Sequence, residues 1–535
     1  MVYAISNACN GCGNCSYVCP NGAIQLTDDQ KNYWIDPTLC DGCKSEVVPI
    51  CAEVCDFSSL TSLPAKKGRY KSTKIPTALP DLFINRKTTP FASSMVIWET
   101  CNILAQRHTL PWLTDSEGYL YYHRTVQRGK GEMRFRLTTN LQAAEIVPEQ
   151  TEEAKAALAN FDIRSTCIHL IFAAHAVASD RPWQEPFLLN NQHIEQYLGL
   201  EKRKDLTKLE KLTLIKKWIY ETCSILVSID WPRQGKVSAF HLDEHPVWSL
   251  LETQYYFEED EQGFSHLVGL EFTLQAGIWV KYFLNQEEYR NQNAFYQYGI
   301  LPKSLLAEIM SNWQQHEGAI RLLLWLLFKV RLGGDQRLKI RTLLHIAYGE
   351  ERVQEAIKVR GNHKRLLKTF ESDLESIYFY GLKPLFDEDT YPNEIQPLWA
   401  RIAAIPDNSD AAVEFWVEDA NAEYSLTNNA PRNKWQRLLN SRLQGFELPQ
   451  DWQQGVHRRT PKHSRSLFSH SKNAHQPTQL SGNQVRMARQ QQNLTQRALA
   501  ARLGKSQSWI RDIEKERFKI NTDDQVLLQK VLEIK

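Results

Sequence analysis

The 535-residue chain lacks any long apolar run. Its longest stretch of consecutive apolar side chains is seven residues, 322–328, and it lies between Arg321 and Lys329. A membrane-spanning helix needs about 20 such residues, so the sequence predicts none. The first residues, MVYAISNAC, have neither a basic start nor an apolar core. We therefore expect no export signal and a cytoplasmic protein.

Motifs of common enzyme classes are also absent. The chain contains no glycine-rich phosphate loop, no GxGxxG after an expected strand and no HExxH pair. The middle of the chain holds eleven histidines, and none is spaced from a cysteine as metal ligands usually are. We therefore expect that the protein is not an enzyme.

Charge is small in sum but unevenly distributed. The net charge is +2, yet residues 457–535 carry +10 and residues 1–456 carry −8. The first 60 residues alone carry −5. This asymmetry predicts that a polyanion such as nucleic acid is bound by the C-terminal end and not by the N-terminal end.

Cysteines are concentrated at the acidic end. Eight of the eleven lie within residues 9–55, whereas Cys101, Cys167 and Cys223 stand singly. A secreted disulfide framework fits poorly with a long chain and such crowding at one end. Metal ligation in a reducing compartment fits this distribution better.

The eight clustered cysteines form two motifs. The first reads C-x2-C-x2-C-x3-C and is followed by proline, and the second reads C-x2-C-x7-C-x3-C. Spacings of three place thiolates around one tight loop, where each can reach a different iron of a cubane cluster. Small residues between the first ligands let backbone N–H groups approach the sulfurs. Two structural zinc sites of four cysteines each are the alternative, although zinc motifs usually pair two CxxC knuckles across a longer gap.

Residues 1–60 resemble bacterial two-[4Fe–4S] ferredoxins with a lengthened second motif. The resemblance implies a ferredoxin-like α+β head with crossed ligation of two clusters. It assigns one cluster to Cys9, Cys12, Cys15 and Cys55, and the other to Cys19, Cys40, Cys43 and Cys51. Asp56 stands where the second motif of that family usually has proline, which is a departure beside the last ligand.

Residues 483–535 predict a small all-helical domain. Thr495 and Ser506 are typical N-caps, Gly504 supplies a tight turn, and apolar residues recur at helical spacing. Two short helices joined by a turn form a helix-turn-helix, whose second helix enters the major groove of DNA. A helical docking domain that touches no DNA is the alternative, but the basic flank favours DNA.

The segment LTQRALAARLGKSQSWIRDIEKER resembles the Cro-type (Xre-like) helix-turn-helix family. The resemblance implies that residues at the start of the recognition helix contact the DNA bases. These residues are Ser506, Gln507, Ser508, Arg511 and Asp512. It also implies a phosphate contact by Gln496 and an internal ion pair between Arg489 and Glu514 that fixes the first helix against the third.

The segments between the two ends complete a multidomain architecture. Residues 61–90, rich in proline and lysine, and residues 451–482, rich in serine and histidine, have the composition of linkers. We expect residues 91–450 to form a mainly helical middle region. A basic helix followed by SILVSID, a PRQG turn and KVSAFHL predicts a winged-helix unit there. An ordinary helical domain with a solvated basic face is the alternative.

The whole architecture resembles the cyanobacterial PatB/CnfR activators of nitrogen-fixation (nif) genes. The resemblance implies transcriptional activation at low oxygen, with promoter DNA and RNA polymerase as partners, and leaves an electron donor and a homodimer open. The sequence also leaves two other functions open. One is an iron–sulfur electron-transfer or redox protein, and the other is a DNA-binding protein like plasmid replication initiators.

Overall fold

The computed structural model divides the chain into two compact units, residues 1–458 and residues 459–535, and each is described by itself. The described residues are 2–6, 8–27, 33–36, 39–40, 42–43, 48–56, 60–63, 81–83, 87–141, 147–259, 264–329, 337–359, 361–421, 425–426, 431, 433–453, 482–492, 494–503, 505–515, 517 and 522–532.

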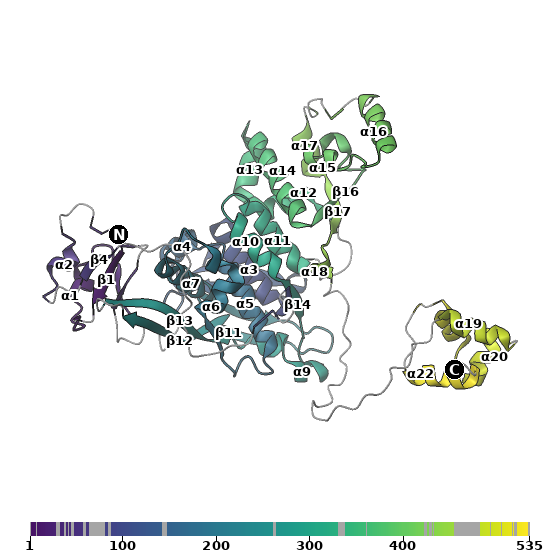
Figure 1. Cartoon of the computed structure of the whole chain (residues 1–535), viewed down its shortest axis with the longest axis horizontal. Coiled ribbons are helices and arrows are strands. Elements are labelled where there is room, and N and C mark those ends of the chain that lie inside the picture. Colours follow the sequence, from purple (N-terminus) through teal and green to yellow (C-terminus); the bar gives the residue numbers. More distant parts are fainter. Residues whose placement is uncertain are drawn as a thin grey trace. The chain divides into compact units, whose positions relative to one another are not determined.

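The N-terminal end forms a small α+β head (Figure 1). Strand β1 (Val2–Ser6) pairs antiparallel with β4 (Leu60–Leu63), and β2 (Ile24–Leu26) pairs with β3 (Tyr33–Ile35). Two short helices, α1 (Asn14–Val18) and α2 (Ile50–Glu53), each lie within one of the two cysteine motifs. Among the described residues of the head, the buried apolar side chains of Ile5, Ile24, Ile35 and Leu60 form one cluster.

The middle region contains more strand than the sequence predicts. Its strands are β5 (Thr88–Ala92), β6 (Leu113–Thr114), β7 (Leu120–Val126), β8 (Gly131–Leu137), β9 (Phe187–Asn190), β10 (Ile225–Trp231), β11 (Phe240–Pro246), β12 (Trp248–Glu259), β13 (Phe264–Ala276), β14 (Tyr298–Pro302), β15 (Leu338–Lys339), β16 (Lys383–Phe386) and β17 (Arg442–Glu447). The expectation of a mainly helical region was therefore wrong, and the region is mixed α/β. The hairpin expected from SILVSID and KVSAFHL is confirmed, since β10 and β11 pair antiparallel.

The helices of this region pack around the strands. They are α3 (Met95–Gln106), α4 (Thr151–Asn160), α5 (Ser165–Ala178), α6 (Asn191–Leu198), α7 (Lys208–Cys223), α8 (Val280–Phe283), α9 (Gln286–Arg290), α10 (Lys303–Asn312), α11 (Glu317–Lys329), α12 (Ile340–Tyr348), α13 (Glu350–Lys358), α14 (Asn362–Tyr380), α15 (Leu398–Ala403), α16 (Ser409–Asn421), α17 (Lys434–Asn440) and α18 (Gln450–Gln453). Short 3-10 segments lie at Arg107–Thr109, Gln127–Gly129, Leu200–Lys202 and Asn393–Ile395. Among the described residues, no helix is long and apolar enough to cross a membrane.

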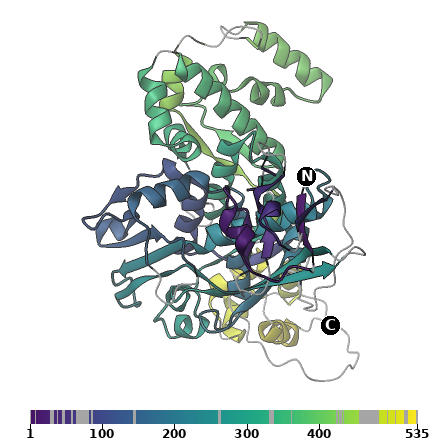
Figure 2. The ribbon, with the colours of Figure 1, turned by 90° about the vertical axis from the view of Figure 1, so that its left-hand side faces the viewer.

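Several sheets organise the middle region. One has the strand order β11-β10-β8-β7-β6, a second has β15-β17-β16, and β14 pairs with β5. The long hairpin of β12 and β13 joins β9 on one side, and β1 of the head also pairs with β13. Figures 1 and 2 both draw the head beside this hairpin. The sheet is therefore shared between the head and the middle region.

A single apolar core holds the middle region together. It includes three fully buried tryptophans, Trp218, Trp248 and Trp279. The Trp248 indole N–H donates to His169 Nδ1 at 3.0 Å, and His169 Nε2 faces the Ile97 carbonyl at 2.9 Å. Burial lowers the pKa of His169 to about 4, so this histidine is a neutral, hydrogen-bonded core residue.

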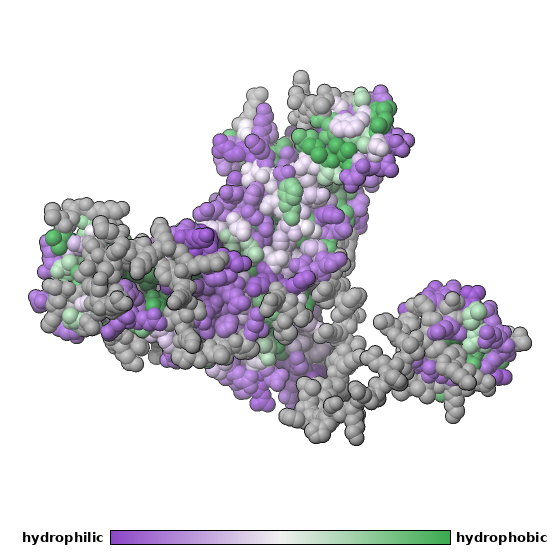
Figure 3. Space-filling view, viewed as in Figure 1, coloured by the Kyte–Doolittle hydropathy of each residue, from purple (hydrophilic) through white to green (hydrophobic). Residues whose placement is uncertain are grey.

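The insertion between β16 and β17 carries exposed apolar side chains. Helices α15 and α16 belong to this insertion, and Figure 3 shows apolar residues gathered over them. The exposed residues are Leu398, Ile402, Val413, Trp416 and Val417. Helix α16 has no buried residue at all among those described.

The structure describes parts of the first expected linker but almost none of the second. The first was expected to span residues 61–90, but β4 continues to Leu63 and β5 begins at Thr88. Leu82 and Phe83 are also buried, and the Leu82 N–H donates to the Tyr197 hydroxyl at 2.9 Å. The connector is therefore shorter than predicted, because these apolar residues dock on α6. Most of the second linker, residues 454–481, lies outside the described residues.

The C-terminal unit is a bundle of four helices. They are α19 (Gly482–Gln491), α20 (Gln496–Leu503), α21 (Gln507–Glu514) and α22 (Thr522–Leu532). Their buried side chains form a core of their own, with Val485, Leu499, Ala500, Leu503, Ile510, Ile513, Leu528 and Leu532. This unit is the all-helical domain that the sequence predicts.

Candidate functional site

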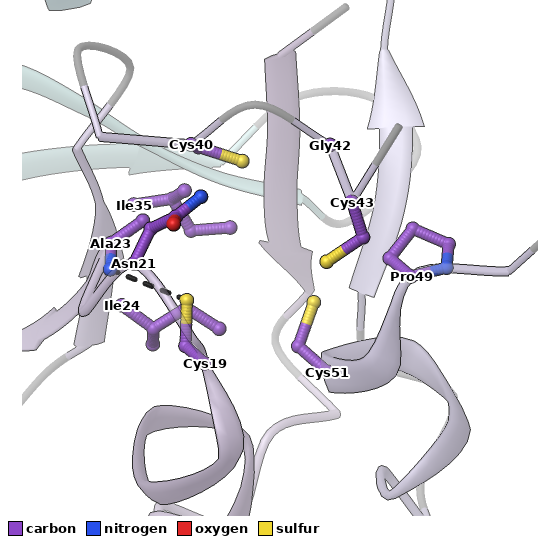
Figure 4. Close-up of a pocket in the computed structure, with 10 residues that line it drawn as sticks. All are labelled: Cys19, Asn21, Ala23, Ile24, Ile35, Cys40, Gly42, Cys43, Pro49 and Cys51. Carbon is purple, nitrogen blue, oxygen red and sulfur yellow. Dashed lines mark hydrogen bonds between the residues drawn. The ribbon is translucent and has the colours of Figure 1, made fainter. Parts of the chain in front are cut away.

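Four cysteines from different parts of the head line one cavity. Figure 4 shows the sulfurs of Cys19, Cys40, Cys43 and Cys51 directed into the space between them. Cys19 follows the last residue of α1, Cys51 lies in α2, and the other two lie in the loop after β3. They are the same four cysteines that the ferredoxin resemblance assigns to one cluster.

The other four cysteines are less completely gathered. Cys15 lies in α1, and burial is the largest cause that raises its pKa, followed by the nearby charges of Cys9 and Cys55. All three pack against the small core of the head. Cys12, the fourth member of this set, is exposed on the loop before α1. The structure thus brings Cys9, Cys15 and Cys55 close together and leaves Cys12 at the surface.

Glycines give the loop around the first motif its shape. Gly11 and Gly13 have φ angles of 74° and 79°, which L side chains rarely adopt. A Cβ atom on Gly13 would also lie 2.8 Å from the Tyr33 hydroxyl. The backbone can therefore turn tightly between the cysteines. Further along, the Ala23 N–H donates to Cys19 Sγ at 3.3 Å, a contact of the kind that stabilises a negative sulfur.

The donors of this cavity are thiols, which are ligands of both iron–sulfur clusters and zinc. Burial, together with the charges of Cys43, Cys19, Cys40 and Cys15, raises the pKa of Cys51 to about 11. Thiols packed in this way become thiolates only when positive metal centres compensate their mutual repulsion. A zinc ion would draw its ligands to within about 2.3 Å of one point. No group of three potential ligands is gathered around a single point in the described part of the chain.

The recognition surface of the C-terminal unit is carried by α21. The Ser506 hydroxyl caps this helix by accepting from the Trp509 N–H at 3.2 Å. Gln507, Ser508 and Arg511 are exposed, while Ile510 and Ile513 on the opposite side are buried in the core. A short helix that buries one side and presents polar side chains on the other suits insertion into a DNA groove.

Comparisons with known proteins agree with both ends of this description. The 4Fe-4S binding domain family matches residues 2–25, and the helix-turn-helix family matches residues 485–535. A ferredoxin-like protein in the nif region of Rhizobium leguminosarum bv. trifolii is 36% identical over 62 residues, which are 11% of this chain and 92% of that protein. The chain belongs, through its N-terminal domain, to the family of ferredoxin-like proteins.

Other relatives match the same ferredoxin-like domain. A ferredoxin-like protein in the nif region of Trichormus variabilis is 44% identical over 57 residues, which are 10% of this chain and 48% of that protein. The chain thus spans about half the length of that relative. No solved structure matches the chain significantly. The protein therefore combines a ferredoxin-like iron–sulfur domain with a helix-turn-helix DNA-binding domain.

The ferredoxin-like domain is fastened to the middle region by residues that the sequence did not single out. Ile5 and Ser6 of β1 pair with Ser265 and Phe264 of β13. Trp34 of β3 is buried and belongs to the core of the middle region. A tryptophan in a short strand gives no sequence signal for such a contact, because its partners are distant in the chain.

Lys216 of α7 completes this contact. Its ammonium group lies 5.2 Å from the centre of the Trp34 ring and donates to the Tyr255 hydroxyl of β12 at 2.7 Å. A lysine over an aromatic face is attracted by the negative face of the ring. The basic helix expected from the sequence is α7, and this part of it faces the ferredoxin-like domain.

The helix-turn-helix domain contains the expected ion pair. Arg489 Nε donates to Glu514 Oε1 at 2.5 Å, and only 11% and 4% of the two side chains are exposed. Gln496 donates to the other carboxylate oxygen at 2.7 Å, so the structure places its amide in this network. Asp512 accepts from Arg517 at 3.1 Å. Gln496 and Asp512 therefore both have protein partners within the domain.

The charge of Glu514 depends on this network. Burial opposes its ionisation, but hydrogen bonds from Arg489 and Gln496 and the charge of Arg489 outweigh burial and lower its pKa below the ordinary 4.5. Because the pKa is lower in the folded domain, the network stabilises the fold above about pH 4.5. This stabilisation is lost as the pH falls through the lowered folded value.

Arg489→Ala should therefore destabilise the helix-turn-helix domain by about 3 kcal/mol at pH 7, because Glu514 remains buried without its partner. The difference from the unsubstituted domain should shrink as the pH falls below about 4.5. Thermal unfolding of residues 459–535, followed by circular dichroism between pH 3 and 7, measures both effects. Arg502→Ala, an exposed arginine of α20, is the control. A difference that stays constant with pH would contradict this assignment.

Proposed function

We propose that the protein is an oxygen- or redox-responsive transcriptional activator of nif genes that holds two [4Fe–4S] clusters. The observation that carries this proposal is that the thiol-rich domain shares a sheet with the middle region in a chain that ends in a helix-turn-helix. A change in the ferredoxin-like domain can thus reach the rest of the protein through backbone hydrogen bonds. Promoter DNA and RNA polymerase are its partners, and it is not an enzyme.

The two-cluster assignment is supported by the grouping of the cysteines. Four line one cavity, and Cys9, Cys15 and Cys55 lie near one another as a second group. When bound, such clusters supply one-electron redox chemistry and sensitivity to oxygen. The chain itself supplies thiolates, backbone N–H groups and an acidic surround.

The nif assignment is supported by the names of the relatives. The ferredoxin-like proteins of Rhizobium leguminosarum bv. trifolii and Trichormus variabilis are both described as lying in a nif region. Nitrogenase is destroyed by oxygen, so synthesis of nitrogen-fixation proteins only at low oxygen is a sensible use of an oxygen-labile switch.

A second candidate function, a DNA-binding protein like replication initiators, is favoured by the connectivity of the middle region. Helix α5, strand β9, helices α6 and α7 and the β12–β13 hairpin follow the order of a winged helix, with the sheet order β12-β13-β9. The β10–β11 hairpin is inserted after α7. Occupancy of repeated sites at a replication origin, as opposed to single promoters, would favour this second candidate.

Anaerobically purified protein should contain about eight irons and eight sulfides per chain, with an absorbance near ~400 nm that is lost in air. Cys51→Ser should remove about half of the iron, because Cys51 lines the cavity of one cluster only. Cys223→Ala, a buried cysteine of the middle region, is the control and should keep full iron. Iron and sulfide analysis measures the result, and zinc without sulfide would contradict the proposal.

Gln507→Ala should weaken binding to the specific operator by about 1–3 kcal/mol and relax the preference at one base pair. Gln507 is exposed at the first turn of α21, where side chains reach base edges. Gln490→Ala, an exposed glutamine of α19, should leave affinity unchanged. Fluorescence anisotropy with operator variants measures both. Unchanged affinity of the Gln507 variant would show that α21 is not the recognition helix.

Exposure to oxygen should weaken operator binding by the full chain and leave binding by residues 459–535 unchanged. The reason is that the C-terminal unit has its own core, whereas the ferredoxin-like domain is joined to the middle region. Operator affinity is compared for the anaerobic full chain, the air-exposed full chain and the C-terminal unit. Equal affinity of all three would show that the clusters control a later step, such as polymerase recruitment.

A further inference from the structure

The second half of the middle region, from α11 to β17, has the order of elements noted for α5 to β13, with one additional helix before the paired strands. Helix α11, strand β15 and helices α12, α13 and α14 precede the antiparallel pair β16 and β17. The sheet order is β15-β17-β16, so the first strand pairs with the last. In a winged helix the helix that precedes the hairpin is the one that faces DNA. Here that helix is α14.

The junction between α13 and α14 has the form of a helix-turn-helix. Only residues 359–361 separate the two helices, and Gly361 has a φ of 103°, which favours glycine. Such short turns with a glycine typically join the two helices of this motif. The Asn362 side chain also donates to Glu355 at 2.9 Å and so ties the start of α14 to α13.

Basic side chains are gathered at the start of α14. Residues 358–368 contain five lysines and arginines and no acidic residue. Lys364, Arg365 and Lys368 are exposed, and none of them forms an ion pair with a described residue. The helical spacing of these three residues places them on one side. The four apolar residues that α14 buries lie on the other side, and they are Leu366, Phe370, Leu374 and Ile377.

The extent of this basic surface is limited. Glu375 lies on the same side of α14, about two turns further along. Glu371 is paired with Lys434 at 2.6 Å, and Asp373 is buried, where it accepts from the Tyr348 hydroxyl at 2.5 Å. The positive charge that is free to meet a ligand is therefore confined to the first two turns of α14.

Helix α7 holds the equivalent position in the first half, but its lysines are buried or have partners within the protein. Its Lys211 is buried, with 2% of the residue exposed, and Lys208 is paired with Glu195 at 2.6 Å. Lys216 faces Trp34 and Tyr255 as described above. Thus α7 also carries several lysines, but these three are buried or have partners within the protein.

We propose that the basic surface formed by Lys364, Arg365 and Lys368 is a second DNA-binding site, which contacts the phosphate backbone of duplex DNA. This inference rests on one part of the proposed function, which is that the chain binds DNA. Lysine and arginine at such a surface bind phosphate with little dependence on sequence. The site would lengthen the stretch of DNA that the full chain contacts beyond the footprint of α21.

The test compares the full chain with the triple variant Lys364→Glu, Arg365→Glu, Lys368→Glu. Acidic residues are tolerated in the first turns of a helix, so the variant should keep its fold, which circular dichroism checks. The triple variant Lys130→Glu, Lys281→Glu, Arg290→Glu changes the same charge at exposed residues elsewhere and is the matched control. Replacement of the three α14 residues by glutamine should give about half the effect.

Binding to an operator duplex just long enough for α21, and to a longer duplex, is measured at several salt concentrations. On the longer duplex, the α14 variant should bind about tenfold or more weakly, and its slope of log K against log salt should fall by about 2–3. On the short duplex it should bind like the unsubstituted chain. The control variant should match the unsubstituted chain on both.

Equal affinity of the unsubstituted chain for both duplexes, or an equal loss in the α14 and control variants, would overturn this inference. Operator recognition through Gln507 would stand in either case. Loss of specific binding by the Gln507 variant, with the dependence on duplex length retained, would support two separate sites. A full chain that binds neither duplex would overturn the inference and the proposed function together.

Discussion

The organisation of the N-terminal domain depends on its eight thiol groups. In the described residues its core is small, with four buried aliphatic side chains and five of the cysteines packed against them. Domains of this kind usually rely on a metal, because metal binding supplies folding free energy that the core cannot. On the proposed function, loss of the clusters would therefore disorder the domain, and with it strand β1. Since β1 pairs with β13, this dependence extends into the sheet of the middle region.

The sequence predicts best those features whose residues lie close together in the chain or in one compact motif. The cysteine motifs, the caps of the C-terminal helices and the Arg489–Glu514 pair all involve residues whose geometry is set locally or by a compact motif. The long hairpin of β12 and β13 was missed for a physical reason. Its register shifts between Leu250 and Glu252 and again between Tyr256 and Phe257. Each irregularity interrupts the alternation of buried and exposed residues by which a strand is recognised.

Long-range contacts explain the other differences. The proline- and lysine-rich segment before β5 has the composition of a linker, yet Phe83 is fully buried with its ring 5.3 Å from that of Tyr197. Likewise, the lysines of α7 suggest a solvated or DNA-binding surface, but Lys211 is buried. A count of charges along a helix does not reveal which of them are neutralised by distant partners. The structure shows these partners, and it indicates that the basic residues of α14, and not those of α7, are available to bind DNA.

The separation of the chain into two units limits how the clusters can control DNA binding. The helix-turn-helix domain has its own core and its own buried ion pair, so its fold does not require the ferredoxin-like domain. Charge attraction between the acidic and basic ends would be screened within about 8–10 Å at cellular salt. On the proposed function, control by the clusters therefore acts on what the middle region adds to α21, such as a second contact with DNA or a surface for polymerase. The sheet that joins β1 to β13 is the element through which such control would pass.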